Sequence, residues 1–469
     1  MPQASVAIVG GGISGLAAAY QLAELGVPFT LYERAARCGG VVLTERIDGY
    51  TIDAGPDALL TQKPAALALC RSLGLGPHLR PQTARETFVV RGGRLRRLPA
   101  ASVLGIPTKW LPFATTGAFS LAGKLRMAAD TVLSSRTADG DESIASFIGR
   151  RFGQEAVAYL AEPLLAGIHG GDATKLSMRA AFPRLLDLEA RYGSVILGLQ
   201  QSGAAMRADA ATGPPPPPVM ALSGGMRDLT DALEASLPRD WIRTCVGVDA
   251  IDRRASGFQL RLSTGERVGA AAVIIATPPP IVGRLTSSLD LALSALCQRI
   301  RMASVVTVAL GFRRDAVAHS LRGAGVVVPR CERRQVRAVS WVSSKFEGRA
   351  PTDRVLLRAF LGGVLQPEAV DLADGEILSR ALGDARSLLG IRGDAEVARV
   401  YRWRDATPQL EVGHVELMTQ IDRRLAANRG VFVTASGFRG TGIADCVADA
   451  RAQASRAAAA VWPRTSAVA

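Results

Sequence analysis

Cysteine and histidine are scarce in this chain of 469 residues, and neither is clustered. The six cysteines form no Cys-x-x-Cys pair, and the four histidines are scattered along the sequence. This spacing argues against a zinc site and against a disulfide framework. We therefore expect no bound metal and a reducing compartment.

Long hydrophobic runs are also missing, and no uninterrupted apolar stretch is long enough to span a bilayer. The first strand-like segment begins near residue 5, which leaves no room for a signal peptide ahead of it. We therefore expect a cytoplasmic protein, either soluble or peripheral at the inner face of a membrane.

Lysine is rare, so arginine supplies most of the positive charge behind the formal net charge of +14. No nucleic-acid-binding motif accompanies this charge, and we expect no nucleic-acid partner. An excess of positive charge instead favours anionic substrates and acidic membrane surfaces.

Glycine is plentiful, with 48 residues, and one glycine motif organises the N-terminal part of the chain. The apolar run 6–9 is typical of a buried parallel strand, and a helical pattern covers 16–23. Gly10, Gly12 and Gly15 stand between them as Gly-x-Gly-x-x-Gly. In this context the first glycine permits a tight turn, the second lets a pyrophosphate approach, and the third lets helix and strand pack closely. The helix N-terminus offers N–H groups to the phosphates.

A second strand-like run, 28–33, ends in Glu33, where an acid binds ribose hydroxyls in dinucleotide-binding proteins. Further glycine turns follow at Gly39-Gly40 and at Gly55-Pro56-Asp57. Enzymes that bind NAD rarely need these extra turns. We therefore predict FAD, which is longer and lies extended through the protein.

The remaining chain alternates between three kinds of pattern. Buried strand-like runs at 273–278 and 430–435, the second followed by a helical pattern at 444–461, indicate two returns to the dinucleotide-binding region. Strand patterns between 305 and 360 indicate an antiparallel sheet, and the prolines at 214–218 predict a stiff loop. We predict an α/β fold with an α+β second domain: a Rossmann-like FAD-binding domain (1–60, 206–283 and 396–469), an antiparallel-sheet substrate domain (61–99 and 284–395) and a helical insertion (100–205).

Longer motifs resemble the FAD-dependent protoporphyrinogen and coproporphyrinogen III oxidases of haem biosynthesis, within the flavin amine oxidase superfamily. The resemblance covers nearly the whole chain, and its most specific segments are 55–60, 162–172, 176–180, 341–346, 357–363 and 439–446. It implies an oxygen-linked, six-electron oxidation of a porphyrinogen in which the flavin takes hydride from a bridging carbon. It leaves the choice between protoporphyrinogen IX and coproporphyrinogen III open. Membrane contact by the helical insertion, hand-off of the product to ferrochelatase and a homodimer are also left open.

The resemblance also implies which residues contact the cofactor. By motif, they are Gly10, Gly12, Ile13, Ser14, Gly15, Glu33, Arg34, Gly39, Gly40, Gly55, Pro56, Asp57, Val248, Ala276, Thr277, Trp403, Gly440, Gly442 and Ile443. Because the cofactor carries the chemistry, we expect no catalytic acid or base.

Substrate contacts follow from the same motifs. A small residue at Ala166 or Gly167 would let a flat macrocycle approach, and Trp341 with Val342 would supply an apolar wall. Mitochondrial-type members place an arginine where Thr87 stands here, so Lys63 and Arg85 are the alternative partners for a propionate.

Other functions use the same flavin core. An amine oxidase or a carotenoid desaturase would share the glycine motifs, and a non-catalytic flavoprotein that binds porphyrin would share them too. Neither of the two enzymes is expected to carry the segment 162–172.

Overall fold

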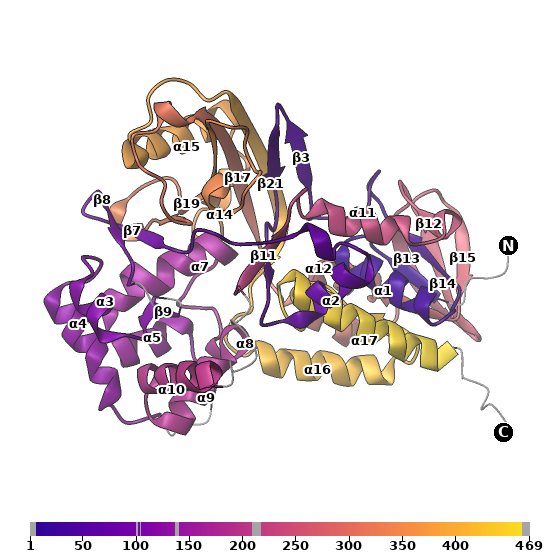
Figure 1. Cartoon of the computed structure of the whole chain (residues 1–469). Coiled ribbons are helices and arrows are strands. Elements are labelled where there is room, and N and C mark those ends of the chain that lie inside the picture. Colours follow the sequence, from indigo (N-terminus) through magenta and orange to yellow (C-terminus); the bar gives the residue numbers. More distant parts are fainter. Residues whose placement is uncertain (1–5, 100–101, 104, 137–139, 209–216, 462–469) are drawn as a thin grey trace.

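The computed structural model describes residues 6–99, 102–103, 105–136, 140–208 and 217–461. Figure 1 shows three regions: a layered α/β region beside the termini, a large sheet with α15 at the top, and a group of helices at the lower left. Most of the predicted proline loop lies outside the described residues.

The α/β region is built on a five-stranded parallel sheet in the order β12-β2-β1-β16-β22. Its strands are β1 (Val6–Val9), β2 (Phe29–Tyr32), β12 (Ile242–Arg243), β16 (Ala272–Ile275) and β22 (Val431–Val433). One face packs against α1 (Ile13–Glu24), α2 (Pro64–Ser72), α11 (Arg227–Ala235) and α17 (Ile443–Val461). The other face packs against β13 (Val248–Arg254), β14 (Gly257–Leu262), β15 (Arg267–Ala270), α12 (Pro279–Leu285), α13 (Leu291–Gln298) and α16 (His414–Ala427). Both faces are therefore buried, as expected for a parallel sheet.

The large sheet has seven strands in the order β21-β17-β20-β19-β18-β7-β8. They are β7 (Thr87–Arg91), β8 (Arg94–Arg97), β17 (Met302–Arg313), β18 (Gly325–Val327), β19 (Ala338–Trp341), β20 (Arg354–Gly362) and β21 (Val397–Pro408). The predicted antiparallel pairing is confirmed except between β7 and β18, which run parallel. These two strands are far apart in the chain, so no hairpin fixes their relative direction. Helix α15 (Asp374–Leu389) covers one face of this sheet.

The structure places two segments, β21 and α2, outside the domain to which the predicted boundaries assign them. Strand β21 pairs with β17 in the seven-stranded sheet, although 396–469 was assigned to the cofactor domain. Helix α2 packs in the core of the α/β region, although 61–99 was assigned to the substrate domain. Strands β5 (Leu59–Leu60) and β6 (Leu79–Pro81) precede and follow α2 in the sequence, and both pair with β11 (Val219–Leu222) in a small sheet. Many residues of β21 are only half-buried, so hydrophobic alternation does not reveal it.

The predicted helical insertion is confirmed as mostly helical. It holds α3 (Trp110–Thr115), α4 (Leu121–Ala128), α5 (Ile144–Phe152), α6 (Gln154–Ala156), α7 (Glu162–His169), α8 (Met178–Ala181), α9 (Pro183–Tyr192) and α10 (Val195–Ala208). A short β9–β10 hairpin (Ser102–Val103 and Ile106–Pro107) precedes them. Ser143 caps α5 by accepting a hydrogen bond from the Ser146 amide at 3.1 Å.

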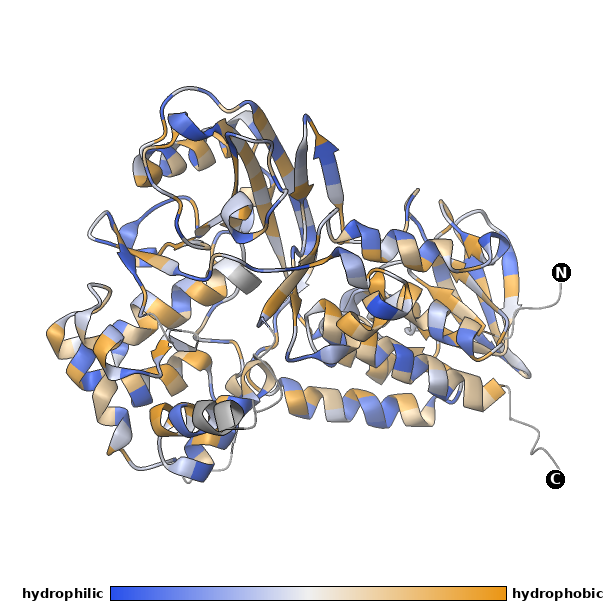
Figure 2. Ribbon diagram, viewed as in Figure 1, coloured by the Kyte–Doolittle hydropathy of each residue, from blue (hydrophilic) through white to orange (hydrophobic). Residues whose placement is uncertain are grey.

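Helices of the described residues are all too short or too polar to cross a membrane. Figure 2 nevertheless shows apolar residues on the outer turns of α3 and α4, at the side of the molecule farthest from both termini.

Candidate functional site

The N-terminal glycines form a tight junction between β1 and α1. Gly10 has a φ of +103°, and a Cβ on Gly15 would lie 1.8 Å from the Gly10 carbonyl oxygen. A Cβ on Gly12, by contrast, would meet nothing within 4 Å. Gly15 is thus required for packing, whereas Gly12 borders open space at the N-terminus of α1, where phosphates bind. Ile13 and Ser14 are buried in the first turn of the helix.

Glu33 closes the turn that faces this junction. Its carboxylate accepts hydrogen bonds from the Gly11 amide at 2.6 Å and the Ala35 amide at 2.7 Å. Arg34 forms an exposed ion pair with Asp249 at 2.7 Å, next to the buried Val248 at the start of β13. The predicted ribose and adenine residues are therefore brought to one side of the parallel sheet.

The second glycine pair folds back onto the first motif. The Gly39 amide donates to the Gly11 carbonyl at 2.8 Å, and a Cβ on Gly40 would lie 3.3 Å from the Gly12 Cα. Arg37 holds this loop by donating to the carbonyls of Cys38 at 2.9 Å and Gly40 at 2.7 Å. Gly39 and Gly40 both have positive φ, which glycine adopts without strain.

Two buried threonine hydroxyls form no hydrogen bond with any residue that the structure describes. Thr277 follows β16 and Thr434 follows β22, so both lie at the carboxyl edge of the parallel sheet. Ala276 touches the glycine turn, because a Cβ on Gly10 would lie 2.8 Å from the Ala276 carbonyl oxygen. Unsatisfied buried hydroxyls are costly, so their presence here fits a polar ligand such as a dinucleotide.

The third glycine site lies between the two sheets. A Cβ on Gly55 would lie 2.0 Å from the Val41 carbonyl oxygen, so only glycine fits there. The Trp403 indole donates to the Ala54 carbonyl at 3.1 Å, and the Thr307 hydroxyl donates to the same oxygen at 2.8 Å. Trp403 is therefore fixed beside Gly55.

Asp57 is bound to two cations. It pairs with Lys345 at 2.9 Å and with Arg358 at 3.0 Å, and Arg358 also donates to the Gly55 carbonyl at 2.7 Å. Burial alone would raise the pKa of Asp57, but Arg358 and Lys345 outweigh it and hold the pKa below its usual range. Asp57 therefore anchors the Gly55-Pro56 segment to the seven-stranded sheet.

The C-terminal glycine turn is also held by side chains. Gly440 has a φ of +146°, and the Gly442 amide donates to Asp445 at 3.3 Å, beside Ile443 at the start of α17. Lys63 pairs with the same Asp445 at 2.7 Å. Lys63 thus lies at the glycine turn and is already engaged there, which weakens its prediction as a propionate partner.

The predicted substrate residues are not brought together. Ala166 and Gly167 lie on α7, where a Cβ on Gly167 would be 3.1 Å from the Ala338 Cβ. Trp341 is fully buried on the face of the sheet that α15 covers, against Phe88 and His319. The prediction that Trp341 forms a pocket wall is therefore wrong, because successive strand residues point to opposite faces.

The two other substrate candidates also lie apart from α7. Val342 is buried with Tyr50 and Ile52 under the hairpin of β3 (Thr44–Ile47) and β4 (Tyr50–Asp53). Arg85 is exposed and forms no hydrogen bond or ion pair with any residue that the structure describes.

This geometry is that of a dinucleotide site between two sheets, and comparison with known proteins gives its family. The model of flavin-containing amine oxidoreductases matches residues 13–461. The chain belongs to this family. Its cofactor is therefore a flavin, which the open face of Gly12 and the two unsatisfied threonine hydroxyls can accommodate.

The relatives within this family include several bacterial enzymes. The coproporphyrinogen III oxidase of Bacillus subtilis (strain 168) is 35% identical over 459 residues, which cover 96% of this chain and 97% of the relative. The enzyme of the same name from Propionibacterium freudenreichii is 32% identical, over 95% of this chain and 89% of the relative. A crystal structure from Exiguobacterium sp. 255-15, provisionally named a protoporphyrinogen oxidase, has a TM-score of 0.83 at 29% identity, covering 96% of this chain and 98% of that one.

Some residues of the candidate site are not predicted from the sequence. Arg37, Lys345 and Arg358 hold the glycine segments in place, yet the motifs single out only the glycines and the acids. An arginine inside the apolar strand 354–362 was the available signal. Cys446 lies on α17 and is buried next to Ser14 of α1. This burial raises the pKa of its thiol to about 12.

Proposed function

We propose that this protein oxidises coproporphyrinogen III to coproporphyrin III, with FAD as its cofactor and oxygen as the electron acceptor. The observation that carries this proposal is the 35% identity to the Bacillus subtilis coproporphyrinogen III oxidase along nearly the full length of both chains. Protoporphyrinogen IX is the second candidate substrate, because the mitochondrial protoporphyrinogen oxidase of Nicotiana tabacum is 29% identical over 91% of this chain.

The chain's own residues position the cofactor in this proposal. The Glu33 carboxylate would accept hydrogen bonds from the ribose hydroxyls in place of its present contacts with backbone amides. The N-terminus of α1, which begins just after Gly12, would face the pyrophosphate. Trp403 and the segment 55–57 would border the ring, with Asp57 held by Arg358. Bound FAD supplies hydride acceptance and reaction with oxygen, so the protein needs to orient and shield rather than donate protons.

We assign the α/β region with the five-stranded sheet to cofactor binding. The face of the seven-stranded sheet that packs against α7, opposite the face that α15 covers, would bind the substrate together with α7. This assignment places β21 in the substrate layer and α2 in the cofactor layer, and so revises the sequence-based boundaries at two points.

Peripheral membrane contact is the proposed role of the outer helices. Exposed apolar side chains gather on α3, α4 and the turn after them: Trp110, Leu111, Leu121, Leu125 and Val132. Lys109 and Lys124 stand among them in the sequence. An apolar surface with flanking cations favours the interface of an anionic membrane. From there, the metal-free product could pass to a ferrochelatase.

The first experiment compares coproporphyrinogen III and protoporphyrinogen IX under air, with porphyrin fluorescence as the readout and the FAD spectrum checked beforehand. Faster turnover of coproporphyrinogen III supports the proposal. Faster turnover of protoporphyrinogen IX would overturn the choice of substrate but keep the reaction class. Activity only on an amine such as putrescine, or FAD that porphyrinogen cannot reduce without oxygen, would overturn the reaction itself. Size-exclusion chromatography of the same preparation tests for a homodimer.

A further inference from the structure

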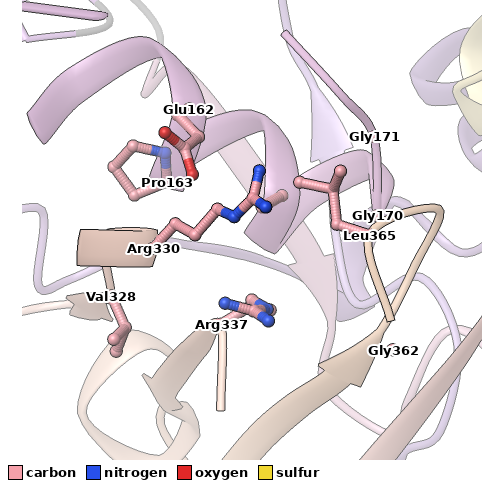
Figure 3. A pocket seen from close by; sticks show the side chains of 10 residues that line it. Glu162, Pro163, Gly170, Gly171, Val328, Arg330, Arg337, Gly362 and Leu365 are labelled. Carbon is pink, nitrogen blue, oxygen red and sulfur yellow. The ribbon is translucent and has the colours of Figure 1, made fainter. Parts of the chain in front are cut away.

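A small pocket lies where α7 meets the seven-stranded sheet (Figure 3). Its empty volume is about 280 Å3, part of which is open to solvent. The lining is apolar or backbone apart from three charged side chains, Glu162, Arg330 and Arg337. Figure 3 shows both guanidinium groups entering the same space, with Glu162 on the helix side.

The two arginines of this pocket form no ion pair with any residue that the structure describes. Arg337 is 9% exposed, and the only hydrogen bond that its side chain makes with a described residue runs from Nε to the Gln366 side chain at 3.1 Å. Neither Arg330 nor Arg337 has a carboxylate within 4 Å among the described residues. Burial lowers the pKa of Arg337 and the charge of Arg330 lowers it further, while Glu162, Glu368 and Asp384 offset this in part. A buried guanidinium with free N–H groups is costly unless an anion binds it.

Glu162 does not neutralise the pair. Burial raises the pKa of Glu162, and its carboxylate forms no ion pair with either guanidinium. Two arginines against one carboxylate leave a surplus positive charge, and planar guanidinium groups match the geometry of a carboxylate.

The pocket also adjoins the flavin site. Gly170 lines it, and a Cβ on Gly170 would lie 2.7 Å from Val305 on β17. Val305 is the cross-strand partner of Trp403, and two residues further along β17 Thr307 bonds the Ala54 carbonyl. Gly170 therefore connects the pocket, through Val305, to the strand that carries Trp403. Ala166, the predicted substrate residue, lines the same pocket.

We propose that Arg330 and Arg337 bind one carboxylate arm of the porphyrinogen in this pocket while its ring lies against the flavin. This inference rests on the proposed function and supplies the propionate partner that Lys63 and Arg85 do not provide. The apolar lining suits the methylene groups of the arm, and the two guanidinium groups bind its terminal carboxylate.

The test compares Arg330→Gln and Arg337→Gln with Arg322→Gln, an exposed arginine of the same sheet region that has no partner among the described residues. We measure kcat and KM with coproporphyrinogen III, and separately titrate coproporphyrin III onto each holoenzyme. Loss of one charge-assisted contact should raise KM about tenfold or more and weaken coproporphyrin binding equally. We expect kcat to change by less than about threefold, since the flavin contacts are untouched. Arg322→Gln should match the wild type.

Two further probes separate a binding role from a structural one. Arg337→Lys keeps the charge and should recover part of the affinity for coproporphyrin III. If Arg337→Gln fails to fold, Arg330→Gln still tests whether the pocket binds the carboxylate, because Arg330 is exposed and its replacement should not affect folding. Coproporphyrin III tetramethyl ester, which lacks carboxylates, should bind wild type and Arg330→Gln equally.

If the wild type turns over coproporphyrinogen III, and Arg330→Gln has the same KM and the same affinity for coproporphyrin III as the wild type, this inference is overturned while the proposed function stands. A wild-type enzyme that oxidises neither porphyrinogen and does not bind coproporphyrin would overturn the proposed function as well. If Arg330→Gln also loses affinity for protoporphyrin IX, the bound arm is one that both porphyrins carry, and this outcome supports the inference.

Discussion

Arg358 on β20 forms a 3.0 Å ion pair with Asp57, which follows the third glycine turn. The same guanidinium donates to the carbonyls of Asp53 and Gly55, both at 2.7 Å. This single side chain therefore links the seven-stranded sheet to the segment expected to border the flavin. The link makes the position of that segment depend on charge, which can be tested.

Replacing Asp57 by Asn should destabilise the fold by about 3 kcal/mol, because the buried Arg358 and the half-buried Lys345 would lose this counter-ion. Urea unfolding of the variant measures this loss. The exposed pair Arg313–Asp315 is the control, since solvent screens this pair and Asp315→Asn should cost far less stability than Asp57→Asn. Equal losses in the two variants would contradict the buried network.

The stability that Asp57 contributes should depend on pH in one direction. Its folded-state pKa is lowered, so the contribution is complete above the unfolded-state pKa of about 4 and is lost as pH falls towards the folded value. The difference in unfolding free energy between wild type and Asp57→Asn should stay constant from about pH 8 to pH 5 and shrink at pH 3. A difference that grows on acidification would have the wrong sign.

Gly12 and Gly15 should respond differently to alanine. A methyl group at Gly15 would collide with the Gly10 carbonyl oxygen at 1.8 Å, so Gly15→Ala should prevent folding of the junction. Gly12 has an ordinary φ of −67° and open space, so Gly12→Ala should fold but bind less FAD. The absorbance ratio of flavin to protein and the Tm of each variant distinguish the two effects.

A glycine without such a role provides the control for this comparison. Gly383 lies within α15, and a Cβ there would meet nothing within 4 Å. Gly383→Ala should keep full FAD content and stabilise the helix by about 1 kcal/mol. Full FAD content in Gly12→Ala would contradict the proposed pyrophosphate position.

Asp130 should be essential to the helical insertion. It is fully buried and accepts from Arg151 at 2.5 Å, from the Ser194 hydroxyl at 2.6 Å and from the Ile196 amide at 2.9 Å. Asp130→Ala removes the nearer counter-ion of the buried Arg151 and leaves only Glu189 at 3.4 Å, so it should cost about 3 kcal/mol in urea unfolding. Asp187→Ala, at an exposed position on α9, should cost little. A small loss at Asp130 would show that the insertion does not depend on this network.

The apolar surface of α3 and α4 should bind anionic vesicles. Leu111 is 76% and Leu125 66% exposed, so Leu111→Asp with Leu125→Asp should reduce co-flotation with phosphatidylglycerol vesicles without lowering the Tm. Leu291→Asp, at a 77% exposed leucine on α13, is the matched control and should float like the wild type. Unchanged flotation of the double variant would contradict the proposed membrane contact.

Local contacts were predictable from the sequence. The unit from β1 to β2, with its three glycines and Glu33, spans fewer than 30 residues, and strand, turn and helix preferences in it agree with one another. The β7–β8 hairpin was predictable for the same reason, because Gly92 and Gly93 adopt the positive φ that its tight turn requires.

Long-range contacts were not predictable. Trp341 belongs to a sheet with helices on both faces, so both faces are apolar and the pattern does not say which one a side chain occupies. Lys63 could have faced a substrate, but Asp445, near the other end of the chain, lies within 2.7 Å of it.

The sequence by itself therefore determined the dinucleotide-binding unit, the helical insertion and the family resemblance, because these rest on local spacing and on motifs. Only the tertiary structure decided which charges meet: Asp57 with Arg358, Lys63 with Asp445, and Arg330 with Arg337 around a shared pocket. The physical reason is that charge pairing and the face of a buried strand depend on which distant segments pack together, and no local pattern in the sequence encodes that choice.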